Sequence, residues 1–249
     1  MSVLPGSHDT CAIAVMAKAP RPGFSKTRLV PPLTPDAAAA MSAAFLRDTT
    51  ENIAQAARDA SAARGAPIQG YAAYAPAGLE ALFDGHLADS TPLLLADGSG
   101  PMPASVQGFG RCLLHAIRSL LDMGFGAACL LNSDGPTLPT AILTRAAREL
   151  AAPGDRAVLG PAEDGGYYLL GVKQAHARLF EDIAWSTADV AAQTRDRATS
   201  IGLPVVELPV WYDIDDGEAL ARLLASYREA ENDAYAAPAT RACVERLRL

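Results

Sequence analysis

Basic side chains concentrate in one short segment near the N-terminus. Residues 18–28 contain four cations, in a chain that averages about one Lys or Arg per twelve residues: Lys18, Arg21, Lys26 and Arg28. Cations and backbone N–H groups that converge at such a turn bind phosphates, and Gly23 helps to shape the turn. We therefore predict an anion site here, with an ordinary solvated basic loop as the alternative. A Walker A motif is excluded because Pro20 and Ser25 replace its two glycines.

A polar turn, Asn132-Ser133-Asp134-Gly135-Pro136, directly follows the apolar run 127–131. An aspartate at the end of a buried strand can hold Mg²⁺ or Mn²⁺, which are hard cations that bind oxygen and bridge to substrate phosphates. Asp134 is therefore a candidate metal ligand. Asp-Gly-Pro is also a common plain turn, and that interpretation stays open.

A second acidic segment contains Asp213, Asp215, Asp216 and Glu218. In an extended chain Asp213 and Asp215 point to the same face, which suits a divalent metal site or a general base. Alternatively, Asp216 caps a following helix and Glu218 complements its dipole. Capping does not require all four acids, so both interpretations remain.

A third polar segment, Glu163-Asp164-Gly165-Gly166, lies between two strand-like runs. Its glycines suit a tight hairpin turn. The same glycine pair would let a substrate approach the backbone, with Glu163 or Asp164 binding sugar hydroxyls or acting as a base. These residues support a plain hairpin turn and a substrate-binding site equally.

These segments lie in a chain that alternates strand-like and helix-like runs. The predicted strands are 11–16, 68–74, 92–95, 127–131, 157–160, 167–172 and 205–208. The predicted helices are 34–63, a short one at 78–82, 109–121, 139–150, a pair between 172 and 205, and 218–231. This order predicts an α/β fold: a three-layer α/β/α sandwich around a mostly parallel sheet. Such sheets bind ligands at the carboxyl ends of their strands, where the polar segments lie.

No composition break divides the chain, so we predict a single domain over residues 1–231 and a C-terminal helical appendage over 232–249. The net charge of −7 argues against a nucleic-acid partner. No apolar run reaches the roughly 20 residues that span a bilayer. The four cysteines form no C-x-x-C pair, and Cys11 and Cys129 lie in strand-like runs, so we expect reduced core thiols and a cytoplasmic protein.

Five motifs in order make the sequence resemble a bacterial family of predicted glycosyltransferases. Members have a GT-A-like nucleotide-diphospho-sugar transferase fold and are labelled as a domain of unknown function or as arsenosugar-biosynthesis glycosyltransferases. The resemblance covers about residues 11–225. It is carried by KAPRPGFSKTRL (18–29), SDGPTL (133–138), LGPAEDGGYYLLG (159–171), WST (185–187) and WYDIDDGEAL (211–220).

The resemblance implies a role for several residues. Lys18, Lys26 and Arg28, with Gly23, would hold the nucleotide phosphates. Asp134 would be the last acid of a D-x-D metal motif whose first position is Asn132 here. Asp213 and Asp215 match an acidic turn that related nucleotidyltransferases use near a second metal, so Asp213 is expected to be a metal ligand together with Asp134. Gly165, Gly166 and Tyr167 would line the sugar or acceptor side, with Asp164 and Asp215 as catalytic side chains.

The chain departs from the family pattern at residues 107–112. Relatives have L-G-x-R here, whereas this chain has Cys112 at the arginine position and Arg111 one residue earlier. Gln107 and Arg111 are the side chains that could still contact a nucleotide from this helix start.

The leading functional hypothesis is glycosyl transfer from a nucleotide-diphospho-sugar to a small-molecule acceptor, with Mg²⁺ or Mn²⁺ as cofactor. The metal and basic side chains would stabilise charge on the diphosphate leaving group. Nucleotidyl transfer, in which a nucleoside triphosphate loses pyrophosphate to a phosphorylated acceptor, is the nearest alternative. A nucleotide-binding protein without catalysis is a third.

Overall fold

Seven strands form one sheet in the order β3-β2-β1-β4-β6-β5-β7. This computed structural model describes residues 6–89, 91–227 and 234–249. Every strand lies within one residue of its predicted bounds, because each is a short apolar run between turn residues. The strands are β1 (Cys11–Ala17), β2 (Ile68–Tyr74), β3 (Leu93–Leu95), β4 (Ala127–Leu131), β5 (Ala157–Pro161), β6 (Tyr167–Val172) and β7 (Val205–Glu207).

All strands except β6 run in the same direction. β1 pairs in parallel with β2 and β4, and β5 pairs in parallel with β7. β6 lies antiparallel between β4 and β5. The predicted mostly parallel α/β sheet is therefore confirmed. The carboxyl ends of the parallel strands share one edge with the beginning of β6, and we call this the carboxyl edge.

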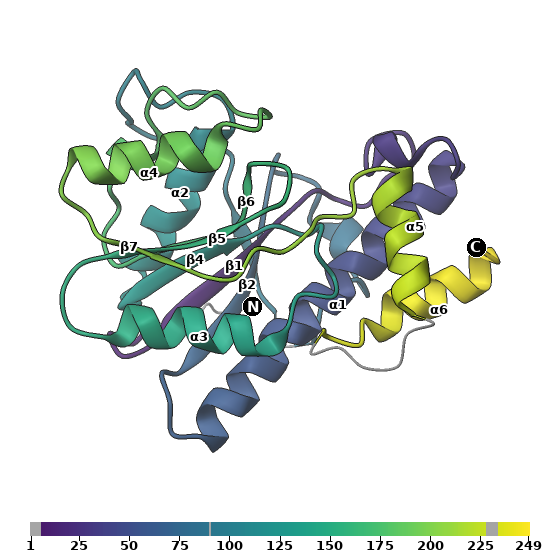
Figure 1. Cartoon of the computed structure of the whole chain (residues 1–249), viewed down its shortest axis with the longest axis horizontal. Coiled ribbons are helices and arrows are strands. Elements are labelled where there is room, and N and C mark those ends of the chain that lie inside the picture. Colours follow the sequence, from purple (N-terminus) through teal and green to yellow (C-terminus); the bar gives the residue numbers. More distant parts are fainter. Residues whose placement is uncertain (1–5, 90, 228–233) are drawn as a thin grey trace.

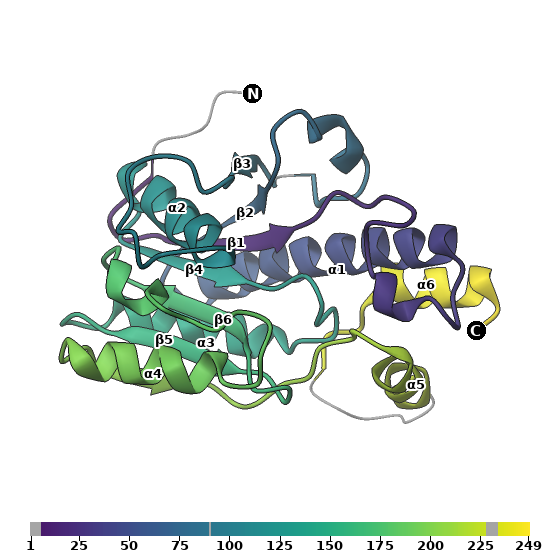
Figure 2. The same ribbon diagram turned by 90° about the horizontal axis from the view of Figure 1, so that it is seen from above.

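Helices cover both faces of the sheet (Figures 1 and 2). α1 (Pro35–Ala62) and α3 (Thr140–Ala151) lie on one face, and α2 (Phe109–Asp122) and α4 (Val190–Ser200) on the other. Three 3-10 turns complete this part of the fold: η1 (Thr27–Leu29), η2 (Glu80–Phe83) and η3 (Ala177–Phe180). The three-layer sandwich that the sequence predicts is thus present.

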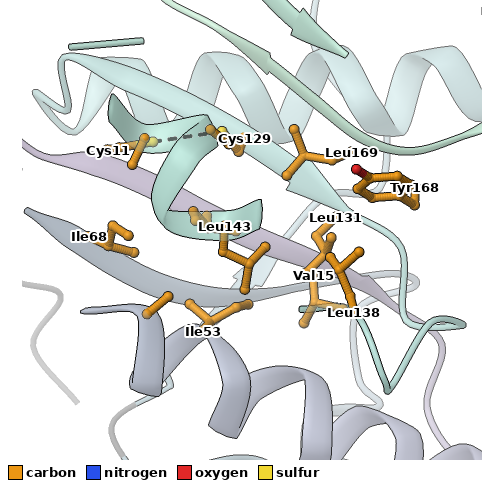
Figure 3. Close-up of a cluster of buried hydrophobic side chains, with 14 of the residues drawn as sticks. Cys11, Val15, Ile53, Ile68, Cys129, Leu131, Leu138, Leu143, Tyr168 and Leu169 are labelled. Atoms are coloured by element: carbon orange, nitrogen blue, oxygen red, sulfur yellow. Dashed lines mark hydrogen bonds between the residues drawn. The ribbon is translucent and has the colours of Figure 1, made fainter. Parts of the chain in front are cut away.

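The α1/α3 face carries a core to which β1, β2, β4, β6, α1 and α3 all contribute side chains (Figure 3). Cys11 and Cys129 are buried there as free thiols, with their Sγ atoms 3.7 Å apart, as expected of reduced core cysteines. Ile53 of α1 and Leu143 of α3 pack on the same strands. Burial of this apolar surface holds β1 and β4 rigidly against their helices, and both strands end at the carboxyl edge.

A third apolar cluster lies beside the sheet and joins η1, α1, α5 (Gly217–Ser226) and α6 (Pro238–Leu247). Cys243 and Val244 of α6 are buried in it. Asp48 of α1 accepts hydrogen bonds from the backbone N–H groups of Ala239 and Thr240, at the first turn of α6. The predicted boundary between domain and appendage, at residues 231 and 232, lies outside the described residues, so that division stays a prediction.

Two helix starts follow the capping signals in the sequence. Thr34 accepts a hydrogen bond from the Ala37 N–H, with Pro35 in the first helical turn of α1. The Asp216 side chain accepts a hydrogen bond from the Ala219 N–H at the start of α5. α5 ends at Ser226, earlier than the predicted 231, and residues 228–231 lie outside the described part of the chain. Among the described residues, no helix is long and apolar enough to cross a membrane.

Candidate functional site

Three charged segments that are far apart in the sequence meet at the carboxyl edge. The Lys26 Nζ atom lies 2.8 Å from Asp134 Oδ1 and 2.8 Å from Asp215 Oδ1. It also donates a hydrogen bond to the carbonyl oxygen of Ile214, again at 2.8 Å. Three oxygens from two segments therefore surround one ammonium group, whose side chain is only 8% exposed.

The loop before η1 holds Lys26 in an uncommon backbone conformation. Its φ is +50°, in the left-handed region that non-glycine residues seldom occupy. The buried Ser25 hydroxyl donates to the Ala19 carbonyl and accepts from the Arg21 N–H, which fixes the loop just before Lys26. Strained backbone of this kind persists where surrounding contacts hold it, and it often marks functional sites.

The strand-end turn and the 213–215 segment are bonded to each other directly. The Ile214 N–H donates to the Asp134 carbonyl at 2.8 Å. Next to this bond, the Asn132 amide donates to Asp213 Oδ1 at 2.7 Å. Asp134 and Asp215 therefore face the ammonium of Lys26, whereas Asp213 faces a neutral amide.

Asp213 is in an unusual electrostatic environment for a carboxyl group. Burial raises the pKa of Asp213 to about 7, although the hydrogen bond from Asn132 acts in the opposite direction. Nearby charges on Asp134, Asp215 and Asp164 raise this pKa further, so Asp164 lies on the same side of the edge. Near neutral pH this carboxyl group can hold or release a proton, as a general acid or base requires.

The other basic residues of the loop remain exposed. Arg28 is 72% exposed at its side chain, with one guanidinium nitrogen 3.9 Å from Asp215 Oδ2. Lys18 is exposed directly after β1. Gly23 has φ of +76° with open space around it, so the backbone is accessible at that turn. Arg21 stacks on Phe24, 4.3 Å from the ring centroid. Of these predicted phosphate ligands, Arg28 contacts the Lys26 cluster directly, through Asp215.

The segment 162–166 forms the predicted hairpin turn between β5 and β6. Asp164 is exposed, and its Oδ1 accepts a hydrogen bond from the Gly166 N–H. Gly165 has φ of +88°, and a Cβ there would lie 2.0 Å from the Ala188 carbonyl oxygen. Gly165 therefore permits a close contact within the protein. The Tyr167 hydroxyl is buried and has no hydrogen-bond partner among the described residues.

The hairpin is also attached to α5 by an ion pair that nothing in the sequence indicates. Both carboxylate oxygens of Glu163 contact the guanidinium of Arg222, at 2.6 and 3.2 Å. Arg222 in turn stacks on the ring of Tyr212 at 3.9 Å. The pair joins the hairpin to the segment that carries Asp213.

The start of α2 lies at the same edge, but its polar side chains bind the protein itself. Arg111 donates to the carbonyls of Gly98 and Gly100, which shapes the loop between β3 and α2. Gln107 is exposed and donates to the Ala104 carbonyl. Trp185 packs on Gly110, where a Cβ would lie 2.9 Å from the indole ring. No contact joins Gln107 or Arg111 to the Lys26 cluster in the part of the chain that the structure describes.

The oxygens around Lys26 are of the type that Mg²⁺ and Mn²⁺ prefer. Within residues 6–89, 91–227 and 234–249, no group of three or more His, Cys, Asp and Glu side chains is arranged to hold a metal by itself. Mg²⁺ is often bound by one or two carboxylates together with substrate phosphates and water. Asp134 and Asp215 fit such an ion, provided that the ammonium of Lys26 leaves the point where their oxygens converge.

Comparison with known proteins agrees with this fold. A crystal structure from Desulfovibrio desulfuricans, described as a candidate nucleotide-diphospho-sugar transferase, is 26% identical. It superposes with a TM-score of 0.75 over 96% of each chain, so the present fold is that of a nucleotide-diphospho-sugar transferase. A family model described as "uncharacterized protein conserved in bacteria (DUF2064)" matches residues 59–187, just over half of the chain. The chain belongs to this family.

Other solved structures are less similar. Rv0371c from Mycobacterium tuberculosis, in a complex with manganese, is 18% identical with a TM-score of 0.42, over 87% of this chain and 98% of that one. A CMP:2-keto-3-deoxy-manno-octonic acid synthetase complexed with CTP is 10% identical with a TM-score of 0.48, over 88% and 98%. No curated protein gives a significant match.

Proposed function

We propose that this protein is a transferase that takes a sugar from a nucleotide-diphospho-sugar and passes it to a small-molecule acceptor. The observation that carries the proposal is the meeting of the basic loop with Asp134 and Asp215 at the carboxyl edge. Such an edge is the usual ligand site of open α/β sheets. The likeness to a candidate nucleotide-diphospho-sugar transferase over 96% of both chains supports the same class.

In this reaction the bond between the anomeric carbon and the donor's phosphate oxygen breaks, and the acceptor oxygen bonds to that carbon. The nucleoside diphosphate leaves with the electron pair, and the acceptor loses its proton. Lys18, Lys26 and Arg28 would bind the diphosphate and stabilise its added charge, since prearranged cations act most strongly where charge develops. Asp134 and Asp215 would hold Mg²⁺ or Mn²⁺, which adds positive charge at the leaving group when bound.

The acceptor side is proposed for the hairpin and the segment that it contacts. Asp164 is exposed there, and the pKa of Asp213 near 7 suits a group that accepts a proton near neutral pH. Gly166 and Tyr167 lie beside Asp164 in the chain. A cytoplasmic location stays a prediction.

A thermal-shift screen of nucleotides and nucleotide sugars, with and without Mn²⁺, tests the proposal. A ligand that binds the native state raises the apparent stability by mass action, so the preferred donor should give the largest increase in Tm. The Asp134→Ala variant should lose the Mn²⁺-dependent part of that increase. Asp196→Ala, at an exposed aspartate of α4, is the matched control and should keep it.

The products then identify the reaction. Release of a free nucleoside diphosphate supports glycosyl transfer. Release of pyrophosphate from a nucleoside triphosphate would show nucleotidyl transfer instead. Ligand binding without turnover in Mg²⁺ or Mn²⁺ would leave a nucleotide-binding protein and contradict both enzymatic assignments.

A further inference from the structure

Lys26 occupies the position that a divalent cation would need. Its Nζ atom makes three 2.8 Å contacts, to Asp134 Oδ1, Asp215 Oδ1 and the Ile214 carbonyl. These are hard oxygen ligands that converge on one point, and at present the point is filled by an ammonium ion. A metal ion and this ammonium cannot share it, because both are positive and both need the same oxygens.

The charges at this point support a competition between the two cations. Two carboxylates and one ammonium leave a net charge of −1, and Arg28 is only 3.9 Å from Asp215. A divalent ion added to this group would meet two positive side chains. If the ammonium moves away, the two carboxylates match the charge of the ion, and the freed ammonium can neutralise part of a diphosphate.

The side chain at this position has the properties that such a movement requires. Lysine is a compact point charge on a flexible four-carbon stem, whereas arginine presents a wide planar fork. Lys26 is one of only three lysines among the 21 Lys and Arg residues, and the other 18 are arginines. The backbone at Lys26 is held by Ser25 and η1, so the side chain can change partners without a rearrangement of the loop.

We propose that Lys26 competes with the divalent metal for Asp134 and Asp215, so that the metal binds strongly only when a diphosphate draws the Lys26 ammonium away. Metal and diphosphate then bind cooperatively, and each raises the affinity for the other by the same factor. This inference rests on the proposed function, because it takes the nucleotide's diphosphate as the group that attracts Lys26.

The first experiment uses Mn²⁺ alone, followed by isothermal titration calorimetry. We expect Lys26→Met to bind Mn²⁺ at least about 10-fold more tightly than the wild type, because the competing ammonium is absent. Lys173→Met is the matched control. Lys173 donates to the carbonyls of Ala152 and Gly154 at the end of β6 remote from the site, and its loss should leave Mn²⁺ binding unchanged.

The second experiment uses the wild-type protein, so it does not depend on whether Lys26→Met folds. Thermal shifts are measured with Mn²⁺, with inorganic pyrophosphate and with both. We expect the two together to raise Tm by clearly more than the sum of their separate effects. In Lys26→Met, Mn²⁺ alone should raise Tm, and pyrophosphate should add little.

Equal Mn²⁺ affinity in the wild type and Lys26→Met would overturn the competition, whatever reaction the protein catalyses. Additive effects of Mn²⁺ and pyrophosphate in the wild type would overturn the cooperative binding. If both expectations hold but no nucleotide sugar is consumed, the competition stands and the proposed glycosyl transfer fails.

Discussion

The two halves of the carboxyl edge treat their charged side chains differently. Around Lys26, an ammonium and two carboxylates from segments more than 80 residues apart in the sequence bond to one another. Around the β5–β6 hairpin and the start of α2, Asp164 and Arg111 instead bond to backbone groups of nearby turns. The half-exposed Glu163–Arg222 ion pair is the exception on this side. Charges paired with each other can be exchanged for the charges of a ligand. Charged side chains that bond to backbone groups of turns instead maintain the shape of the loops beside the ligand.

Asp215→Asn should have the largest effect, because it removes one of the two carboxylates that converge on Lys26. We expect turnover of the best donor to fall on the order of 10²-fold or more, as when a prearranged electrostatic contact is lost. The rate is measured at saturating donor and Mn²⁺. Wild-type turnover of this variant would exclude Asp215 from the proposed site. The charge cluster around Lys26 would then have no role in the reaction.

Gly165→Ala tests how strongly the close packing of the β5–β6 hairpin contributes to the free energy of unfolding. A Cβ at this position would lie 2.0 Å from the Ala188 carbonyl, and φ is +88°. We expect a loss of about 3 kcal/mol in the free energy of unfolding, within the range of severe backbone effects. Gly23→Ala is the comparison: its φ is also positive but the space is open, so the expected loss is about 1 kcal/mol. Urea unfolding measures both, and equal losses would show that the Ala188 contact is unimportant.

Asp213→Asn should stabilise the metal-free protein at alkaline pH. Burial raises the pKa of Asp213 to about 7, above the value near 4 of an unfolded chain, so the native state binds the proton more tightly. The wild type therefore loses stability as pH rises from about 4 to 7, and the asparagine variant does not. We expect the variant to be more stable at pH 8 by about 3 kcal/mol.

This difference corresponds to several degrees in Tm, and it should nearly vanish at pH 4. Asparagine can still accept the hydrogen bond from Asn132, so the variant changes the charge and keeps the contact. A stability difference that is the same at both pH values would show that Asp213 titrates normally.

Glu163→Gln should have the smallest effect. The Glu163–Arg222 pair is bidentate, but both side chains are about half exposed, and such pairs contribute about 0–1 kcal/mol. We expect a fall in the free energy of unfolding of less than about 1 kcal/mol, reduced further in high salt. A loss above this range would mean that the hairpin depends on α5 for its position.

Much of the fold follows from local patterns in the sequence. Strand bounds were predictable because apolar runs end at Gly, Pro and polar residues, and the start of α1 was predictable from Thr34 and Pro35. The common edge for 18–28, 132–136 and 213–215 also follows, since parallel strands end on the same side. The prediction for the last helix extended beyond Ser226, because its end depends on packing.

The pairings within the site could not be predicted. Lys26 has three basic neighbours in its candidate segment, and nothing in the local sequence distinguishes the one whose side chain reaches Asp134 and Asp215. Lys26 also has a left-handed backbone conformation, which a non-glycine residue seldom adopts and which the sequence does not indicate. The family resemblance places Asn132 at the first position of a metal motif, whereas in the structure its amide donates a hydrogen bond to Asp213. The ion pair of Arg222 could not be predicted from the local sequence, because its partner Glu163 lies 59 residues away.

The reversed direction of β6 has an evolutionary consequence. A parallel strand must be reached through a crossover that returns from the opposite edge. Because β6 runs against β5, the two are joined by a tight hairpin at the carboxyl edge itself. Insertions between Ala162 and Gly166 would leave the strand register below the hairpin intact, but they would disturb the contacts of Glu163 with Arg222 and of Gly165 with Ala188. We expect relatives to differ more in this hairpin than in the strands that lead to Lys26 and Asp134.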